Sequence, residues 1–125
     1  MSLLVLESYR MLAWIDLYLL RGDFHSLYKR VRSFPAAPKR GKPYSVENIC
    51  AAVDMASIWY WKRVLCLQRS AAAACLLKRY GINATMVIGA QMLPFKAHAW
   101  VEVDGRVVND KSYVDEMYVV LDRCS

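Results

Sequence analysis

PFKAHAWVEVDGRVVND, residues 94–110, contains the clearest structural signal in the chain. Two runs rich in alternating and β-branched residues, Ala97 to Val103 and Arg106 to Asp110, flank the dipeptide Asp104-Gly105. An Asp-Gly pair between two such runs is typical of a β-hairpin turn. The stretch therefore predicts two antiparallel strands in the C-terminal half of the chain.

The length of this turn determines which side chains of the hairpin meet. A two-residue turn would place Asp110 opposite Ala99, on the face away from His98. A three-residue turn, Val103-Asp104-Gly105, needs its glycine in the left-handed conformation. That turn places His98 opposite Asp110, with the two Cβ atoms about 5 Å apart, which suits an imidazole–carboxylate hydrogen bond.

We predict the three-residue turn, because it also sets Glu102 opposite Arg106 as an opposite-charge pair. One face of the hairpin then carries small and β-branched side chains that suit a core: Ala99, Val101, Val103 and Val107. Asn109 points toward the same face and needs a hydrogen-bond partner there.

Helical patterns dominate the chain before the hairpin. We expect helices over residues 3–20, 24–32, 45–59 and 65–80, with Asp23 and Ser45 as N-caps and Gly22 and Gly81 as stops. Residues 34–43 hold three prolines and predict a loop. Residues 82–89 predict a strand, and residues 114–121 suit either a strand or a helix. Helices followed by strands indicate an α+β fold, with N-terminal helices packed on a small antiparallel sheet.

The size and composition suit one globular domain. The chain has 125 residues, of which 57% are hydrophobic and 22% charged. We therefore expect a single domain over 1–125, with a helical part at 1–65 and a catalytic helix plus antiparallel strands at 66–125.

The net charge of +6 is concentrated in one run between residues 29 and 42, which holds six of the 17 basic residues. Such a run attracts nucleic acid, anionic lipid or an acidic peptide, although a solvated loop has the same composition. Neither aromatic interleaving nor a nucleic-acid-binding motif accompanies it, so no nucleic-acid partner is expected.

The cysteine pattern fits neither a zinc site nor a disulfide framework. The four cysteines are spaced by 16, 9 and 49 residues, and the chain has only two histidines: Cys50, Cys66, Cys75 and Cys124; His25 and His98. The N-terminal apolar run is interrupted by Glu7, Arg10 and Asp16, so neither a signal peptide nor a membrane span is expected. We predict a cytoplasmic protein with reduced thiols and without a metal or cofactor.

Cys66 is the best candidate for a nucleophile. It stands at the predicted start of a helix, where free N–H groups and the helix dipole favour a thiolate and can hold an oxyanion. Cys75 lies on the opposite face of the same helix, and Cys50 lies inside another. His98 and Asp110 would supply the base and the group that orients it. The residues alone leave a structural histidine and a turn-forming aspartate as alternatives.

Several neighbours of these residues have two interpretations. Gln68 and Arg69 either touch substrate or serve the structure, and Trp59, Trp61 and Trp100 either wall a substrate groove or pack in the core. The apolar helix at 3–20 is either central to the core or a docking surface.

Two pieces of the sequence resemble the peptidase domain of lasso-peptide B proteins, a branch of the transglutaminase-like superfamily of papain-type thiol enzymes. One is the hairpin stretch quoted above. The other is Cys-Leu-x-Arg-Ser at Cys66 to Ser70, followed by a helix that ends in Arg79-Tyr80-Gly81. The resemblance implies a papain-like cysteine protease core with nucleophile, base and orienting acid at Cys66, His98 and Asp110.

The resemblance further implies a leader peptidase. Such an enzyme cleaves the leader from a ribosomally made lasso-peptide precursor, often with threonine as the leader's penultimate residue, and a macrolactam synthetase then cyclises the released core. Fused members carry a leader-recognition domain ahead of the peptidase. The 65 residues before Cys66 look helical throughout. The chain therefore resembles the split form, which relies on a separate leader-recognition protein.

Two other functions stay open at this point. The same triad can transfer an acyl group to an amine instead of to water, as transglutaminase-like enzymes do. A non-catalytic binding subunit would use the basic run and the apolar helix, although it would have no need of Cys66, His98 and Asp110 together.

Overall fold

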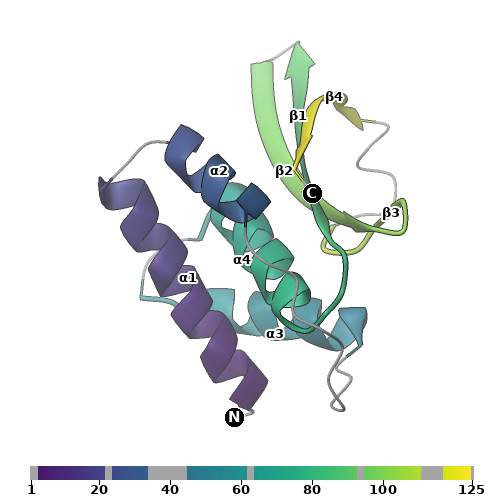
Figure 1. Ribbon diagram of the computed structural model, residues 1–125. Coiled ribbons are helices and arrows are strands. Elements are labelled where there is room, and N and C mark those ends of the chain that lie inside the picture. The colour runs from purple at the N-terminus through teal and green to yellow at the C-terminus, as the bar shows by residue number, and fades with distance from the viewer. Residues whose placement is uncertain are drawn as a thin grey trace.

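The computed structural model describes residues 3–21, 24–33, 45–61, 64–92, 95–110 and 117–124. Within these ranges, four helices precede four strands: α1 (Leu3–Arg21), α2 (Phe24–Ser33), α3 (Val46–Trp59), α4 (Cys66–Arg79), β1 (Thr85–Met92), β2 (Phe95–Val103), β3 (Arg106–Val107) and β4 (Val119–Cys124). The helices form one layer and the sheet forms another beside it (Figure 1). The predicted α+β fold is confirmed.

Local signals account for the start of α3 and the end of α4. The Ser45 hydroxyl accepts a hydrogen bond from the Asn48 backbone N–H and caps α3. After α4, Gly81 has φ of 81°, and the Ile82 N–H donates to the Leu77 carbonyl, as in a Schellman motif. The predicted signals at Gly22 and Asp23 and the loop at 34–43 lie outside the described residues.

Helix α4 occupies the centre of the molecule. It packs against α1 and α3 on one side and against β2 and β1 on the other (Figure 1). Residues 70–78 of this helix are all buried, and four of them are the alanines 71–74. Because alanine side chains are short, neighbouring elements approach α4 closely from every side.

The sheet is antiparallel throughout, in the order β3-β2-β1-β4. β1 pairs with β2 along its whole length, from Thr85 opposite Glu102 to Met92 opposite Phe95. β4 pairs with the other edge of β1, with an irregularity in register between Ile88 and Gly89. The ambiguous C-terminal segment thus ends in a strand, while its residues 114–116 lie outside the described part.

The hairpin between β2 and β3 corrects the predicted turn. Val103 pairs with Arg106, so the turn has two residues, and the predicted three-residue turn is wrong. Asp104 and Gly105 both have positive φ, 52° and 77°. A type I′ turn requires this at both central positions, and its twist matches that of the strands.

Because the turn is one residue shorter than predicted, the strand residues after it lie on the opposite face of the sheet from the predicted one. Val107 packs with Trp100 on the face away from the main core, whereas Val108 packs against the main core instead. Alternation along β2 agrees with this arrangement: Ala99, Val101 and Val103 are buried toward the helices, and Trp100 is buried on the other face.

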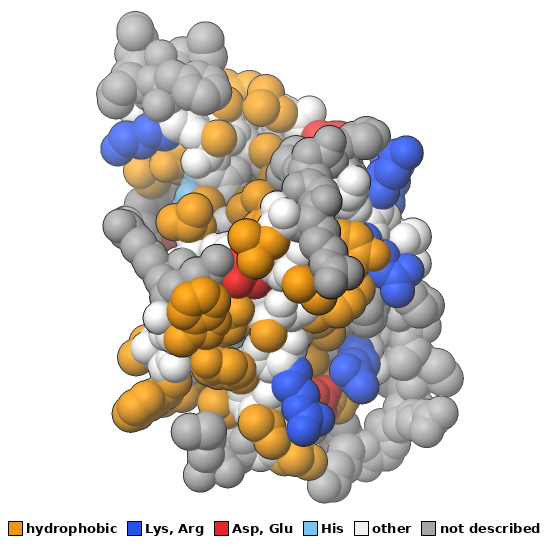
Figure 2. Space-filling model, turned by 90° about the vertical axis from the view of Figure 1, so that its left-hand side faces the viewer, with side chains coloured by type: hydrophobic (Ala, Val, Ile, Leu, Met, Phe, Trp, Pro, Cys, Tyr) orange, Lys and Arg blue, Asp and Glu red, His pale blue; other side chains and the backbone are white. Residues whose placement is uncertain are grey.

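Helix α1 has a buried face and an exposed apolar face. Leu12 and Ile15 lie in the core, while Leu3 and Leu20 are both 71% exposed and Leu6 and Leu17 are also exposed. Figure 2 looks onto this side of the molecule and shows several clusters of hydrophobic side chains. No helix in the described ranges has the length and apolar character needed to cross a membrane.

Candidate active site

Cys66 is the first residue of α4 and is half-buried. The Leu65 N–H that precedes it donates to Gln68 Oε1 at 2.8 Å, which closes the first turn. Backbone N–H groups in the first turn of a helix have no carbonyl partner one turn earlier. The thiol therefore lies beside the positive end of the helix dipole, as the sequence predicted.

Gln68 is a structural residue that anchors this helix start. Its Nε2 donates to buried Asp16 Oδ1 of α1 at 3.0 Å, and the Tyr60 hydroxyl donates to Asp16 Oδ2 at 3.2 Å. Burial, with the Asp16 carboxylate as the next cause, raises the pKa of Tyr60 above its ordinary value. One buried carboxylate thus ties α4 to α1 and to the segment after α3.

His98 lies on β2 opposite Gly89 of β1. Its Nε2 is 2.5 Å from Asp110 Oδ2, and both side chains are largely buried. An ionised carboxylate only accepts hydrogen bonds, so this contact assigns the donor role to Nε2 and leaves Nδ1 as the ring nitrogen that can accept a proton. The predicted contact between His98 and Asp110 is present, although the turn that was expected to produce it is not.

A bend after β3 brings Asp110 to His98. The ladder ends where the Val108 N–H donates to the Val101 carbonyl at 2.9 Å. The Val101 N–H then donates to the side-chain Oδ1 of Asn109 at 2.7 Å instead of to a backbone carbonyl. The backbone bends away from β2 at Asn109 and Asp110. The Asp110 carboxylate therefore does not lie opposite Ala99, where continued strand pairing would place it.

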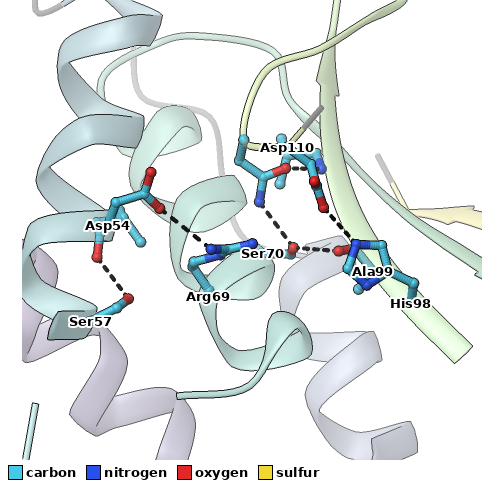
Figure 3. Close-up of polar contacts among 10 residues, drawn as sticks. Asp54, Ser57, Arg69, Ser70, His98, Ala99 and Asp110 are labelled. Atoms are coloured by element: carbon cyan, nitrogen blue, oxygen red, sulfur yellow. Dashed lines mark hydrogen bonds and ion pairs between the residues drawn. The ribbon is translucent and has the colours of Figure 1, made fainter. Parts of the chain in front are cut away.

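Asn109 also fastens this bend to α4 through Ser70, whose contact with Ala99 is drawn in Figure 3. Its Nδ2 donates to Ser70 Oγ at 3.0 Å, and that hydroxyl donates to the Ala99 carbonyl at 2.9 Å. Ser70 stands one turn after Cys66 on the same helix. The partner that the sequence analysis required for Asn109 is therefore Ser70, and the chain of bonds links the helix of Cys66 to the strand of His98.

Cys66 and His98 line the same pocket, which has a volume of about 280 Å³. Its other walls are apolar side chains: Leu67, Ile88, Ala97 and Ala99. An apolar wall beside a thiol and an imidazole lowers the local polarity and so strengthens the electrostatic interactions between them.

A second ion pair lies close to this site and was not predicted. Arg69 NH1 of α4 is 3.9 Å from Asp54 Oδ1 of α3 (Figure 3). The pKa of Asp54 is raised by burial, while Arg69 lowers it and the Asp110 carboxylate raises it. Sequence spacing gives no sign of this pair, because it joins two helices.

The remaining described thiols are poor nucleophiles. Cys75 is fully buried in α4. Burial, reinforced by the Asp54 and Glu47 carboxylates, raises the pKa of Cys50 to about 12. The side chain of Cys124 lies outside the described residues, and no metal-binding cluster of histidine, cysteine or carboxylates occurs within them.

The tryptophans Trp59, Trp61 and Trp100, which the sequence analysis singled out, lie in different surroundings. Trp100 is fully buried, whereas Trp59 and Trp61 are 65% and 73% exposed. Of the two interpretations, core packing is therefore confirmed for Trp100 and is wrong for Trp59 and Trp61.

The sequence is similar to known proteins over two different extents. The sequence profile of the transglutaminase-like superfamily matches residues 11–122. The chain is also 47% identical over 45 residues to the microcin J25-processing protein McjB of Escherichia coli. That match covers 36% of this chain and 22% of the relative, so the chain aligns with about a fifth of the relative's length. No solved structure matches the chain. Since the profile spans nearly the whole sequence, the chain belongs to the transglutaminase-like superfamily.

Proposed function

We propose that the protein is a cysteine peptidase, built as one domain over 1–125, with Cys66 as nucleophile, His98 as general base and Asp110 as the group that orients the base. The observation that carries the proposal is the 2.5 Å contact between His98 Nε2 and Asp110 Oδ2, together with the pocket that His98 and Cys66 both line. Thiol catalysis requires these three groups: a nucleophile, a base that takes its proton and an acid that orients the base.

In the proposed mechanism, His98 acts as base and then as acid in each half of the reaction. His98 Nδ1 takes the proton of the Cys66 thiol, and the sulfur attacks the scissile carbonyl carbon. The Cys66 backbone N–H stabilises the oxyanion. His98 then protonates the leaving amine as the C–N bond breaks, which leaves a thioester. Water, deprotonated by His98, attacks the thioester and releases the carboxylic acid and the free thiol.

We infer that the substrate is the precursor of a lasso peptide, cut between leader and core. Support comes from the 47% identity over 45 residues that the chain shares with the microcin J25-processing protein. A macrolactam synthetase would then act on the amine that cleavage exposes on the core.

We further propose that a separate leader-recognition protein presents the precursor. The exposed leucines of α1 supply a candidate docking surface: Leu3, Leu6, Leu17 and Leu20. Replacement of Leu17 and Leu20 by serine should weaken stimulation by that protein and leave unstimulated cleavage unchanged.

Mass spectrometry of a matched precursor, incubated with and without the recognition protein, tests the proposal. Wild-type protein should yield leader-sized and core-sized fragments, and Cys66→Ala should yield none. Cleavage that survives in Cys66→Ala would overturn the nucleophile assignment. A product that carries an added amine on the acyl fragment would instead establish acyl transfer.

A further inference from the structure

An aromatic side chain outside the proposed triad stacks on His98. The Tyr118 ring and the imidazole have centroids 5.2 Å apart and planes inclined by 23°. Trp100 stands 6.1 Å from both rings. Tyr118 directly precedes β4, so the stack joins the C-terminal segment to the strand that bears the proposed base.

Gly89 makes this arrangement possible. It stands opposite His98 on β1, beside the irregularity in the pairing of β1 and β4. A Cβ atom at Gly89 would lie 2.7 Å from Trp100 Cη2 and 2.9 Å from Tyr118 Cβ. Any other residue would therefore push the two rings away from the sheet and from the imidazole.

The bond to Asp110 does not by itself fix the imidazole. It holds Nε2, but one hydrogen bond still lets the ring plane tilt about that contact. A stacked ring on its face limits this tilt. The electron-rich face of an aromatic ring also favours the cationic imidazolium that forms when His98 takes a proton.

We propose that Tyr118 is a positioning residue, whose ring holds the His98 imidazole so that Nε2 meets Asp110 while Nδ1 stays available to Cys66. This inference rests on the proposed role of His98 as the base. The Tyr118 hydroxyl has no part in it, since the stacking face of the ring is what acts.

The rate of alkylation of Cys66 by iodoacetamide tests this role without any peptide substrate. Site-resolved peptide mapping would give the rate in wild type, Tyr118→Phe, Tyr118→Leu and His98→Ala. Tyr118→Phe keeps the ring and should react within about twofold of wild type, whereas Tyr118→Leu should react about tenfold more slowly. His98→Ala sets the lower limit.

A wild-type rate in folded Tyr118→Leu would overturn the proposal, because a merely structural side chain would change the melting temperature and not the thiol. Should Tyr118→Leu fail to fold, Tyr118→Met offers a flexible apolar side chain for the same comparison. In wild type, nuclear Overhauser contacts must connect the ring protons of Tyr118 and His98, and their absence would also overturn the proposal.

Precursor cleavage is measured separately from thiol alkylation. A wild type that cuts no precursor but shows the alkylation pattern would contradict the peptidase function and leave the role of Tyr118 supported.

Discussion

Asn109 shows how a single side chain can override strand register. Its amide oxygen takes the place of a backbone carbonyl in the ladder, and its amide nitrogen binds Ser70 of the central helix. The next residue, Asp110, thereby leaves the pleat and reaches His98. The sequence predicts the His98–Asp110 contact but attributes it to turn length, because Ser70 lies 39 residues away and offers no local signal.

Replacing Asn109 by alanine should impair both stability and catalysis. The change leaves the buried Val101 N–H without an acceptor, which costs about 1–3 kcal/mol of unfolding free energy. It also frees the bend, and we expect kcat for precursor cleavage to fall by about tenfold or more, since small misplacements of catalytic groups are costly. Ser45→Ala is the matched control, because loss of that cap costs about 1 kcal/mol far from the pocket. Equal kcat in the two variants would contradict this role for Asn109.

The thiols should differ sharply in reactivity. At pH 8, a pKa of about 12 leaves Cys50 with about one thiolate in ten thousand molecules, and Cys75 is fully buried. We expect iodoacetamide to modify Cys66 alone when folded Cys124→Ser protein is treated and mapped by mass spectrometry. Modification of Cys50 at a comparable rate would mean that its surroundings are more open than described here.

Among the structural elements, α4 carries both the proposed nucleophile and the centre of the core. The helices are predictable from sequence because their caps and periodic apolar residues lie within a few positions of one another, as Ser45 and Gly81 illustrate. The anchor of the α4 start is not predictable. Asp16 and Gln68 lie 52 residues apart, and neither differs locally from an ordinary surface residue.

Removing that anchor should loosen the start of α4. Gln68→Leu abolishes the bonds to Leu65 and to Asp16 and leaves a buried carboxylate with one partner fewer, so we expect about 2–4 kcal/mol lower unfolding free energy. Chemical denaturation measures this loss. The double variant Gln68→Leu with Asp16→Leu should recover part of it, since the buried carboxylate that lost the Gln68 amide is then absent. A double variant that is less stable than the sum of the single changes would contradict this account.

For the molecule as a whole, the order of helices and strands was enough to predict the α+β class, and the family match agrees with it. The site was predictable only in part. Cys66, His98 and Asp110 belong to sequence motifs, whereas Tyr118, Gly89 and the Asp54–Arg69 pair come together only through packing of distant segments. Such contacts leave no periodic or local pattern.

Alkaline pH should destabilise the fold through Cys50. Its pKa is raised from 9.0 to about 12 in the native state, so the native protein keeps a proton that the unfolded chain releases. The contribution of the Cys50 thiol to the unfolding free energy is fully present below about pH 9. It falls by about 1.4 kcal/mol per pH unit as the pH rises toward 12. Denaturation of wild type and Cys50→Val between pH 8 and pH 11 measures the difference in slope. Parallel curves would show that Cys50 titrates normally.

The alternation along β2 has a consequence for how this gene can change. Odd-numbered residues from Ala99 to Val103 fill the core, and the even-numbered His98 and Trp100 belong to the aromatic cluster. Insertion or deletion of a single codon here would exchange the two sets at once, whereas point substitutions alter one set at a time. We therefore expect descendants of this gene to diverge in β2 by substitution, to keep its length, and to gain or lose codons in the connections between elements.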